Sequence, residues 1–193
     1  MRKMNLTLVV LCLFSFASAV LASDGNLLGL TIDNSTGKYT VTVTNKELGQ
    51  TLRIAAESSG TQIPIVQYSG GGFIYAVPKY PKMDRLITVW QPGVALNVVV
   101  FRLAPSSQQR KEIVFSGSSE IEPDILNSGY ASDFMLLYTG KRFVKGSNQW
   151  VPRRAVLYEW NGRSYRLIKT VPYEQRFQAV AEVEKRNSVG HRK

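Results

Sequence analysis

The stretch RLITVWQPGVALNVVVFRL, residues 85–103, holds two nearly continuous apolar runs on either side of a turn. Each run has the length of a strand, and Gln91-Pro92-Gly93 between them is a turn signal. A strand with one face in water alternates apolar and polar residues, whereas these runs leave no polar face. They therefore predict an all-β fold of stacked antiparallel sheets: a sandwich, a distorted barrel or a propeller fragment.

The segment KYTVTVT, residues 38–44, has a different pattern. Its apolar residues alternate strictly with threonines, which is typical of a strand with one dry face and one wet face. Residues 52–56 repeat this period after a turn that contains Gly49. The sequence therefore predicts an N-terminal hairpin over residues 36–57.

The rest of the chain reads as strands until close to its end. Further apolar runs, each bounded by turn residues, lie at 72–78, 112–115 and 133–138. Only residues 175–185 have helical spacing of apolar residues, and the basic end that follows reads as a disordered tail. We therefore expect a single β domain over 23–174, followed by a C-terminal helix or disordered basic tail over 175–193.

The first 22 residues have the layout of a signal peptide. Arg2 and Lys3 precede an apolar run over 6–20, which is short for a membrane span, and small residues precede a cleavage site near Ala22. This predicts a secreted or periplasmic protein; a retained anchor is the alternative. Cys12 is the only cysteine, so its removal excludes a catalytic thiol or a thiolate metal site in the mature chain.

Charge is distributed unevenly along the chain. Residues 23–140 carry nine Lys or Arg against ten Asp or Glu, whereas residues 141–193 carry thirteen against four, a net of +9. A basic region of this kind favours an anionic glycan, an envelope polymer or a lipid headgroup as partner, and nucleic acid is not expected for an exported protein. The alternative is a solvated surface that keeps the protein soluble.

The stretch VLYEWNGRSYRLIKTVP, residues 156–172, predicts a second hairpin. Asn161-Gly162 is a strong signal for its tip, because both central positions of a type I′ turn need positive φ. The stretch is also rich in aromatic and basic side chains.

Two longer segments of the chain look alike. FIYAV…RLITVWQPG matches FMLLY…RAVLYEWNG, so Phe73 corresponds to Phe134 and Trp90 to Trp160. This pattern resembles the blades of secreted bacterial β-propeller proteins of the FG-GAP or VCBS kind. The repeat units would cover about 63–115 and 120–172. The calcium loop of FG-GAP repeats is absent from the sequence, and the chain is too short for a closed ring of about four blades or more.

The second hairpin and the residues before it contain the best candidates for binding. Aromatic side chains interleaved with arginine stack on sugar rings and attract anionic groups. These candidates are Lys141, Arg142, Arg153, Arg154, Tyr158, Trp160, Arg163, Tyr165 and Arg166. The alternative is that Tyr158 and Trp160 fill the core between stacked sheets.

Carboxylates are the remaining candidates for chemistry. Glu120, Glu122 and Asp124 alternate in EIEPD, and Asp133 follows. Two of these four could serve as the acid–base pair of a hydrolase acting on envelope polysaccharide. The first three are weak candidates for a calcium site. The alternative is an acidic loop in which Pro123 prevents ladder pairing.

Taken together, these patterns favour a non-enzymatic binding module without a cofactor. The only histidine, His191, lies in the polar tail, which argues against a Ser-His-acid triad or a histidine metal site. The hydrolase just described is one alternative. A scaffold or adhesion module whose exposed strand edges pair with another chain is the other.

Overall fold

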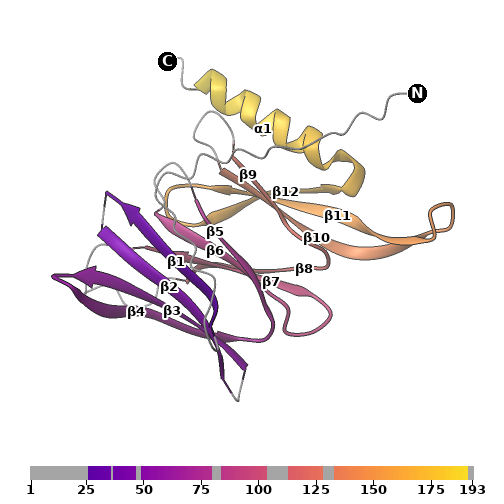
Figure 1. Cartoon of the computed structure of the whole chain (residues 1–193). Coiled ribbons are helices and arrows are strands. Elements are labelled where there is room, and N and C mark those ends of the chain that lie inside the picture. The colour runs from indigo at the N-terminus through magenta and orange to yellow at the C-terminus, as the bar shows by residue number, and fades with distance from the viewer. Residues whose placement is uncertain are drawn as a thin grey trace, which may run out of the picture.

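The computed structural model describes residues 26–35, 37–46, 49–79, 84–103, 113–127 and 133–190. In these residues the chain forms three four-stranded antiparallel sheets, and in each sheet the strands pair in sequence order. The sheets lie on top of one another as layers, with a C-terminal helix above the last one (Figure 1). The predicted fold class, stacked antiparallel sheets in an all-β protein, is confirmed.

The first sheet contains β1 (Asn26–Asn34), β2 (Gly37–Lys46), β3 (Gly49–Ser58) and β4 (Thr61–Gly70). The second contains β5 (Phe73–Pro78), β6 (Arg85–Trp90), β7 (Leu96–Arg102) and β8 (Ile113–Ser119). The third contains β9 (Asp124–Asn127), β10 (Asp133–Val144), β11 (Gln149–Trp160) and β12 (Tyr165–Pro172). After it come the short 3₁₀ helix η1 (Tyr173–Gln175) and α1 (Arg176–Gly190).

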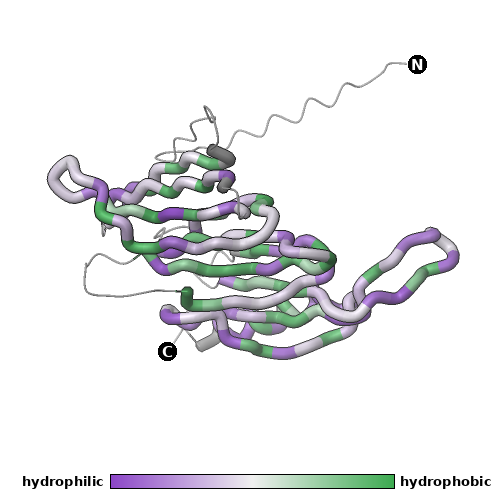
Figure 2. Tube along the Cα trace, turned by 90° about the horizontal axis from the view of Figure 1, so that it is seen from below, coloured by the Kyte–Doolittle hydropathy of each residue, from purple (hydrophilic) through white to green (hydrophobic). Residues whose placement is uncertain are grey.

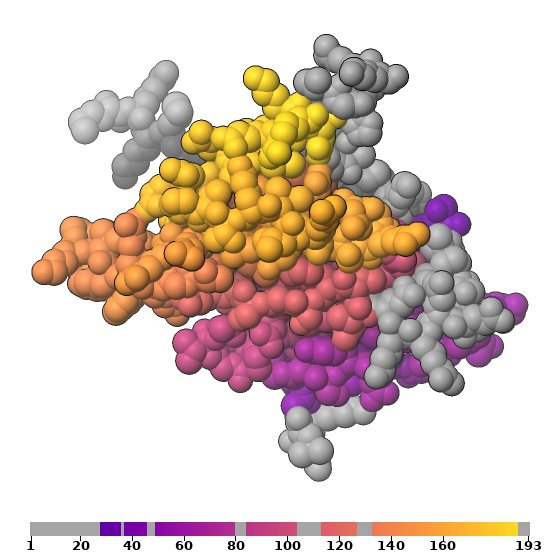
Figure 3. All heavy atoms as spheres, turned by 180° about the vertical axis from the view of Figure 1, so that it is seen from behind, coloured from indigo at the N-terminus to yellow at the C-terminus, as the bar shows by residue number. Residues whose placement is uncertain are grey.

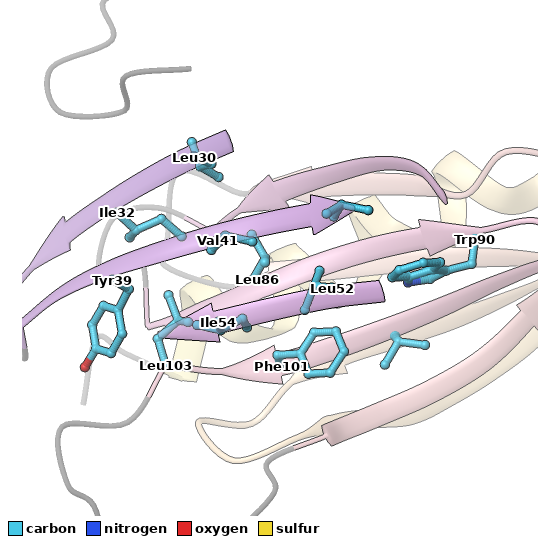
Figure 4. Packing of buried hydrophobic residues seen from close by; sticks show 12 residues of the cluster. Leu30, Ile32, Tyr39, Val41, Leu52, Ile54, Leu86, Trp90, Phe101 and Leu103 are labelled. Atoms are coloured by element: carbon cyan, nitrogen blue, oxygen red, sulfur yellow. The ribbon is translucent and has the colours of Figure 1, made fainter. Parts of the chain in front are cut away.

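The second sheet is the middle layer, and both of its faces are covered. All six residues of β6 are buried. Leu86, Trp90 and Phe101 pack on the first sheet (Figure 4), whereas Ile87 and Val89 pack on the third. Figure 2 shows the apolar residues running through the inner strands of the stack. The continuous apolar runs of the sequence therefore have the physical cause that we expected.

The outer face of the first sheet is polar, so the stack ends there. β2 pairs with β3 in the predicted N-terminal hairpin, which is confirmed. Tyr39, Val41 and Val43 are buried against the middle layer, and the threonines between them face away from it. Lys38 and Glu57 form an exposed ion pair on this hairpin, at 3.1 Å.

At the other end of the stack, α1 covers the third sheet. Ala179, Val180 and Val183 of the helix are buried against apolar side chains of β10 and β11. The helix continues to Gly190, and beyond this apolar stripe the Asn187 side chain donates a hydrogen bond to Glu159 of β11. The disordered tail that we expected after residue 185 is therefore wrong for residues 186–190. The predicted signal peptide and His191 lie outside the described residues.

No helix within the described ranges is long and apolar enough to cross a bilayer.

The second predicted hairpin forms, but its turn differs from the prediction. Trp160 pairs with Tyr165, which leaves a four-residue loop over 161–164 rather than a two-residue turn. Gly162 has a φ of +89°, whereas Asn161 does not adopt positive φ. The Asn161 side chain instead accepts hydrogen bonds from the backbone N–H groups of Arg163 and Ser164, both at 2.9 Å. The loop is therefore an Asx-type turn and not type I′.

The two similar segments form hairpins in neighbouring sheets, at different positions. β5 and β6 are the first two strands of the middle sheet, whereas β10 and β11 are the central two of the third. Trp90 packs between the first and second sheets, and Trp160 packs between the second and third. The similarity therefore reflects a recurrent way of filling the space between layers.

Candidate binding surface

The nine predicted binding residues do not form one surface, because they lie in two groups that are separated along the length of β11. Arg153 and Arg154 lie in the first half of β11, and Trp160 lies six residues after Arg154, at the C-terminal end of the same strand. At about 3.3 Å per residue, roughly 20 Å lies between Arg154 and Trp160. The predicted set therefore divides into an aromatic group near the C-terminal end of β11 and a basic group nearer its N-terminal end.

The aromatic group is part of the packing between layers. Tyr165 is buried, and Tyr158 and Trp160 are half-buried against the middle sheet. The ring of Phe115 lies 5.0 Å from that of Tyr158 and 5.7 Å from that of Tyr165. These aromatic residues fill the core, as the alternative stated, and Tyr165 is only 5% exposed. Only Arg163 and Arg166 of this group are exposed.

A buried ion cluster lies beside these aromatic rings. Asp133 forms an ion pair with Lys79, at 2.9 Å, and accepts a hydrogen bond from Arg85, and all three side chains are buried. The Arg85 guanidinium also lies 4.0 Å from the centre of the Trp160 ring. Burial lowers the pKa of Lys79, and Asp133 opposes that shift. Burial raises the pKa of Tyr165, and the charge of Asp133 adds to the effect.

This cluster joins β6 to β10 and leaves Asp133 enclosed by two cations. The Asp133 carboxylate is buried with its oxygens beside these two cations, so it is not accessible to a substrate and is poorly placed for general acid catalysis. Its position therefore does not favour the hydrolase alternative.

The basic group lies on a hairpin that extends beyond its sheet. β9 pairs with β10 only as far as Leu136, and β12 pairs with β11 only as far as Arg154. Beyond these points β10 and β11 pair with each other alone, from Lys141 opposite Pro152 to Val144 opposite Gln149. We call this two-stranded ribbon together with its root, residues 139–154, the arm. It projects from the body of the molecule (Figures 1 and 3).

An exposed aromatic pair lies near the tip of the arm. Phe143 and Trp150 are opposite each other in the ladder, with ring centres 5.4 Å apart. Phe143 is 45% exposed and Trp150 is 64% exposed. Cross-strand aromatic pairs stabilise isolated ribbons, which are otherwise marginal in water. The sequence analysis missed this pair, although its two residues lie almost symmetrically about the turn at Gly146.

The arm carries five basic residues and no acidic residue. Arg142 forms an ion pair with Glu174 of η1, so its charge is compensated. Lys145, Arg153 and Arg154 are exposed, and Lys141 is half-buried. Arg153 also donates a hydrogen bond from Nε to the carbonyl oxygen of Lys141, at 3.0 Å, which links the two strands of the arm.

The link between β8 and β9 holds the root of the arm. The backbone N–H of Glu120 donates to the carbonyl oxygen of Tyr138 at 2.9 Å, and the Tyr138 N–H donates to Ser119 Oγ at 3.0 Å. The Gly140 N–H then donates to Glu120 Oε1 at 3.0 Å. Gly140 has a φ of +67°, which twists the ribbon at this point. The arm therefore leaves the sheet in a fixed direction.

The other predicted carboxylates serve separate structural roles. Asp124 accepts a hydrogen bond from the Tyr138 hydroxyl, whose pKa is raised by burial and then by Asp124. Burial, with Glu122 nearby, raises the pKa of Tyr75 to about 12. In the described part of the chain, no three acidic, His or Cys side chains are placed to hold a metal ion. The weak calcium candidates Glu120, Glu122 and Asp124 are therefore wrong as a set.

No protein-family model matches this chain, and neither does any curated protein or solved structure. The resemblance to FG-GAP or VCBS blades therefore stays a prediction. Exposed charge and exposed aromatic surface coincide on the arm.

Proposed function

We propose that this protein is an exported, non-enzymatic binding module that holds an anionic partner on its arm. One observation carries the proposal: a projecting two-stranded ribbon combines five basic residues, no acidic residue and an exposed Phe143–Trp150 pair. Such a combination supplies electrostatic attraction and apolar contact at the same point of the molecule.

The fixed root of the arm supports this role. A surface that is already ordered loses little conformational freedom on binding, so more of the contact energy appears as affinity. The Glu120–Gly140 hydrogen bond and the Arg142–Glu174 ion pair both restrain the arm at its base. The basic side chains that remain exposed point into solvent from a ribbon whose direction is set.

Export is the second part of the proposal. It rests on the signal-peptide layout of residues 1–22, and an arm with this chemistry fits the anionic polymers and lipids of a cell envelope. The three carboxylates with structural partners, Glu120, Asp124 and Asp133, weigh against a hydrolase as the main activity.

Retention on polyanions tests the proposal. The chain beginning at Ser23 keeps every described residue and lacks the apolar leader, which would bind lipid by itself. We expect it to be retained on immobilised dextran sulfate and on phosphatidylglycerol vesicles at low ionic strength, and to be released as salt is added. Neutral dextran is the control matrix. Binding to neither of the two anionic probes at low ionic strength would reject the proposed function.

A further inference from the structure

We propose that the partner of the arm is the surface of an anionic lipid bilayer, into whose interfacial region Phe143 and Trp150 insert. This inference rests on the proposed function and narrows it to one kind of partner.

The shape of the arm favours a bilayer over a soluble small ligand. Binding sites for small ligands are concave and enclose most of the ligand surface. Phe143 and Trp150 lie instead on a protruding ribbon, and every residue from Lys145 to Trp150 is exposed. Figure 3 shows this tip standing clear of the body. A bilayer is a partner that a convex tip can enter.

The residue types at the tip match the interfacial layer of a membrane. Tryptophan prefers this layer because its ring is apolar and its N–H remains able to bond to headgroups or water. The tilted Phe143–Trp150 pair, with ring planes at 58°, presents edges rather than one flat face. A flat stacking platform for a sugar ring would require a face that is free along its length.

The charges around the tip match anionic headgroups. Lys145 lies in the turn, and Arg153 and Arg154 lie nearer the root, so cations flank the aromatic pair along the ribbon. Long basic side chains keep their charges at headgroup level while their stems contact apolar surface. Each basic residue near an anionic leaflet strengthens binding by about fivefold.

A second exposed apolar residue lies at the end of the molecule from which the arm projects. Val94, in the turn between β6 and β7, is 85% exposed. Leu96, just after this turn, pairs with Ser119, whose hydroxyl accepts the N–H of Tyr138 near the root of the arm. The turn over 91–95 carries no charge. The end of the stack that would face a bilayer therefore offers apolar residues on two separate loops.

Trp150 provides a direct probe for insertion. Trp90 is fully buried, and Trp160 is half-buried under Arg85, so Trp150 is the most exposed of the three tryptophans. The chain beginning at Ser23 is titrated with phosphatidylcholine vesicles with and without phosphatidylglycerol, and fluorescence is recorded with and without bromine-labelled acyl chains. We expect a blue shift and bromine quenching only with the anionic vesicles, and we expect the Trp150→Phe variant to lose both signals.

Binding variants separate a lipid partner from a polymer partner. Phe143→Ala/Trp150→Ala should weaken vesicle binding by about tenfold or more while leaving retention on dextran sulfate nearly unchanged. Leu167→Ala is the matched control, because Leu167 is 54% exposed at the opposite end of the stack, and it should change neither. Circular dichroism establishes that each variant is folded.

Three outcomes are decisive. Vesicle binding with Trp150 quenching that depends on the aromatic pair supports the inference. Retention on dextran sulfate without vesicle binding, or vesicle binding without Trp150 quenching, overturns the inference but leaves the proposed function standing. Binding to neither probe overturns both.

Discussion

At the scale of single residues, Asp133 of β10 forms a buried ionic link between the third sheet and the second. Its carboxylate is buried between Lys79 and Arg85, and Arg85 in turn lies over Trp160. A buried ion pair adds little net stability over apolar packing, but removal of one partner leaves an uncompensated charge in the interior. Removal of one member should therefore destabilise the fold by more than the intact cluster stabilises it.

We expect Asp133→Ala to lower the free energy of unfolding by about 3–5 kcal/mol, since buried Lys79 loses its counter-charge and Arg85 keeps only its ion pair with Asp84. Urea unfolding at neutral pH measures this change. Asp33→Ala is the control, because Asp33 is exposed on β1, and it should shift stability by less than about 0.5 kcal/mol. Equal effects of the two substitutions would show that the Asp133 cluster is solvated.

Tyr75 provides a test by pH. Its pKa is raised to about 12, mainly by burial, against about 10 in an unfolded chain. The neutral phenol is thus favoured in the folded state, so its contribution to stability is complete below pH 10 and is lost as the pH rises towards 12. The stability of Tyr75→Phe relative to the wild type should therefore increase over this interval, as measured by urea unfolding. A difference that is independent of pH would contradict the assignment.

The burial of single side chains was only partly predictable from the sequence. Alternation placed Tyr158 and Trp160 on one face of their strand, and both do pack towards the middle sheet. Whether that face is covered depends on a partner sheet that comes from residues 73–119, which local pattern does not identify. For this reason the sequence left both possibilities open for these two aromatic residues.

At the scale of the elements, the arm is the feature that distinguishes this molecule from a plain stack of sheets. Its root depends on Glu120, whose Oε1 accepts the Gly140 N–H in place of a neighbouring strand. Gly140 also needs the positive φ at which its N–H meets this carboxylate.

Glu120→Ala should release the amide of Gly140 and make the arm more mobile. Hydrogen exchange measured by NMR should show faster exchange at Gly140 and through the first half of the arm, with a loss of about 1.5–3 kcal/mol for a hydrogen bond to a charged group. Glu122→Ala is the control, because Glu122 is exposed and accepts no hydrogen bond from the arm. Unchanged exchange at Gly140 in Glu120→Ala would mean that the ribbon holds its own direction.

The arm also shows why element boundaries were hard to predict. The apolar run over 133–138 predicted the buried part of β10, but the strand continues to Val144 through a glycine and two basic residues. Those residues have the composition of a loop, and they are held in a ladder by the cross-strand pairing of β10 with β11, which includes Phe143 with Trp150. Similarly, α1 extends beyond its predicted end, where Asn187 donates a hydrogen bond to Glu159 of the sheet beneath the helix.

At the scale of the whole molecule, the stack explains how one chain of modest size covers its apolar strands. The first and third sheets cover the two faces of the middle sheet. The outer face of the first sheet is polar, and α1 covers the outer face of the third. The apolar runs of the sequence predicted this enclosure. The charge asymmetry predicted a basic surface, but it did not show that the basic residues are distributed between the arm and the opposite end of β11.

This distribution leads to the most direct test of the central claim, which is that the arm rather than the total charge binds the partner. Two variants are compared, each of which loses four positive charges. One carries Lys141→Gln, Lys145→Gln, Arg153→Gln and Arg154→Gln, all in the arm. The other carries Arg163→Gln, Arg166→Gln, Lys185→Gln and Arg186→Gln, all exposed and all outside it.

The measurement is co-sedimentation of each variant with phosphatidylglycerol vesicles at a fixed low ionic strength. We predict that the arm variant loses binding by at least about 100-fold, whereas the variant with substitutions elsewhere changes by less than about fivefold. Equal losses in the two variants would contradict the account, because binding would then follow net charge and not the arm.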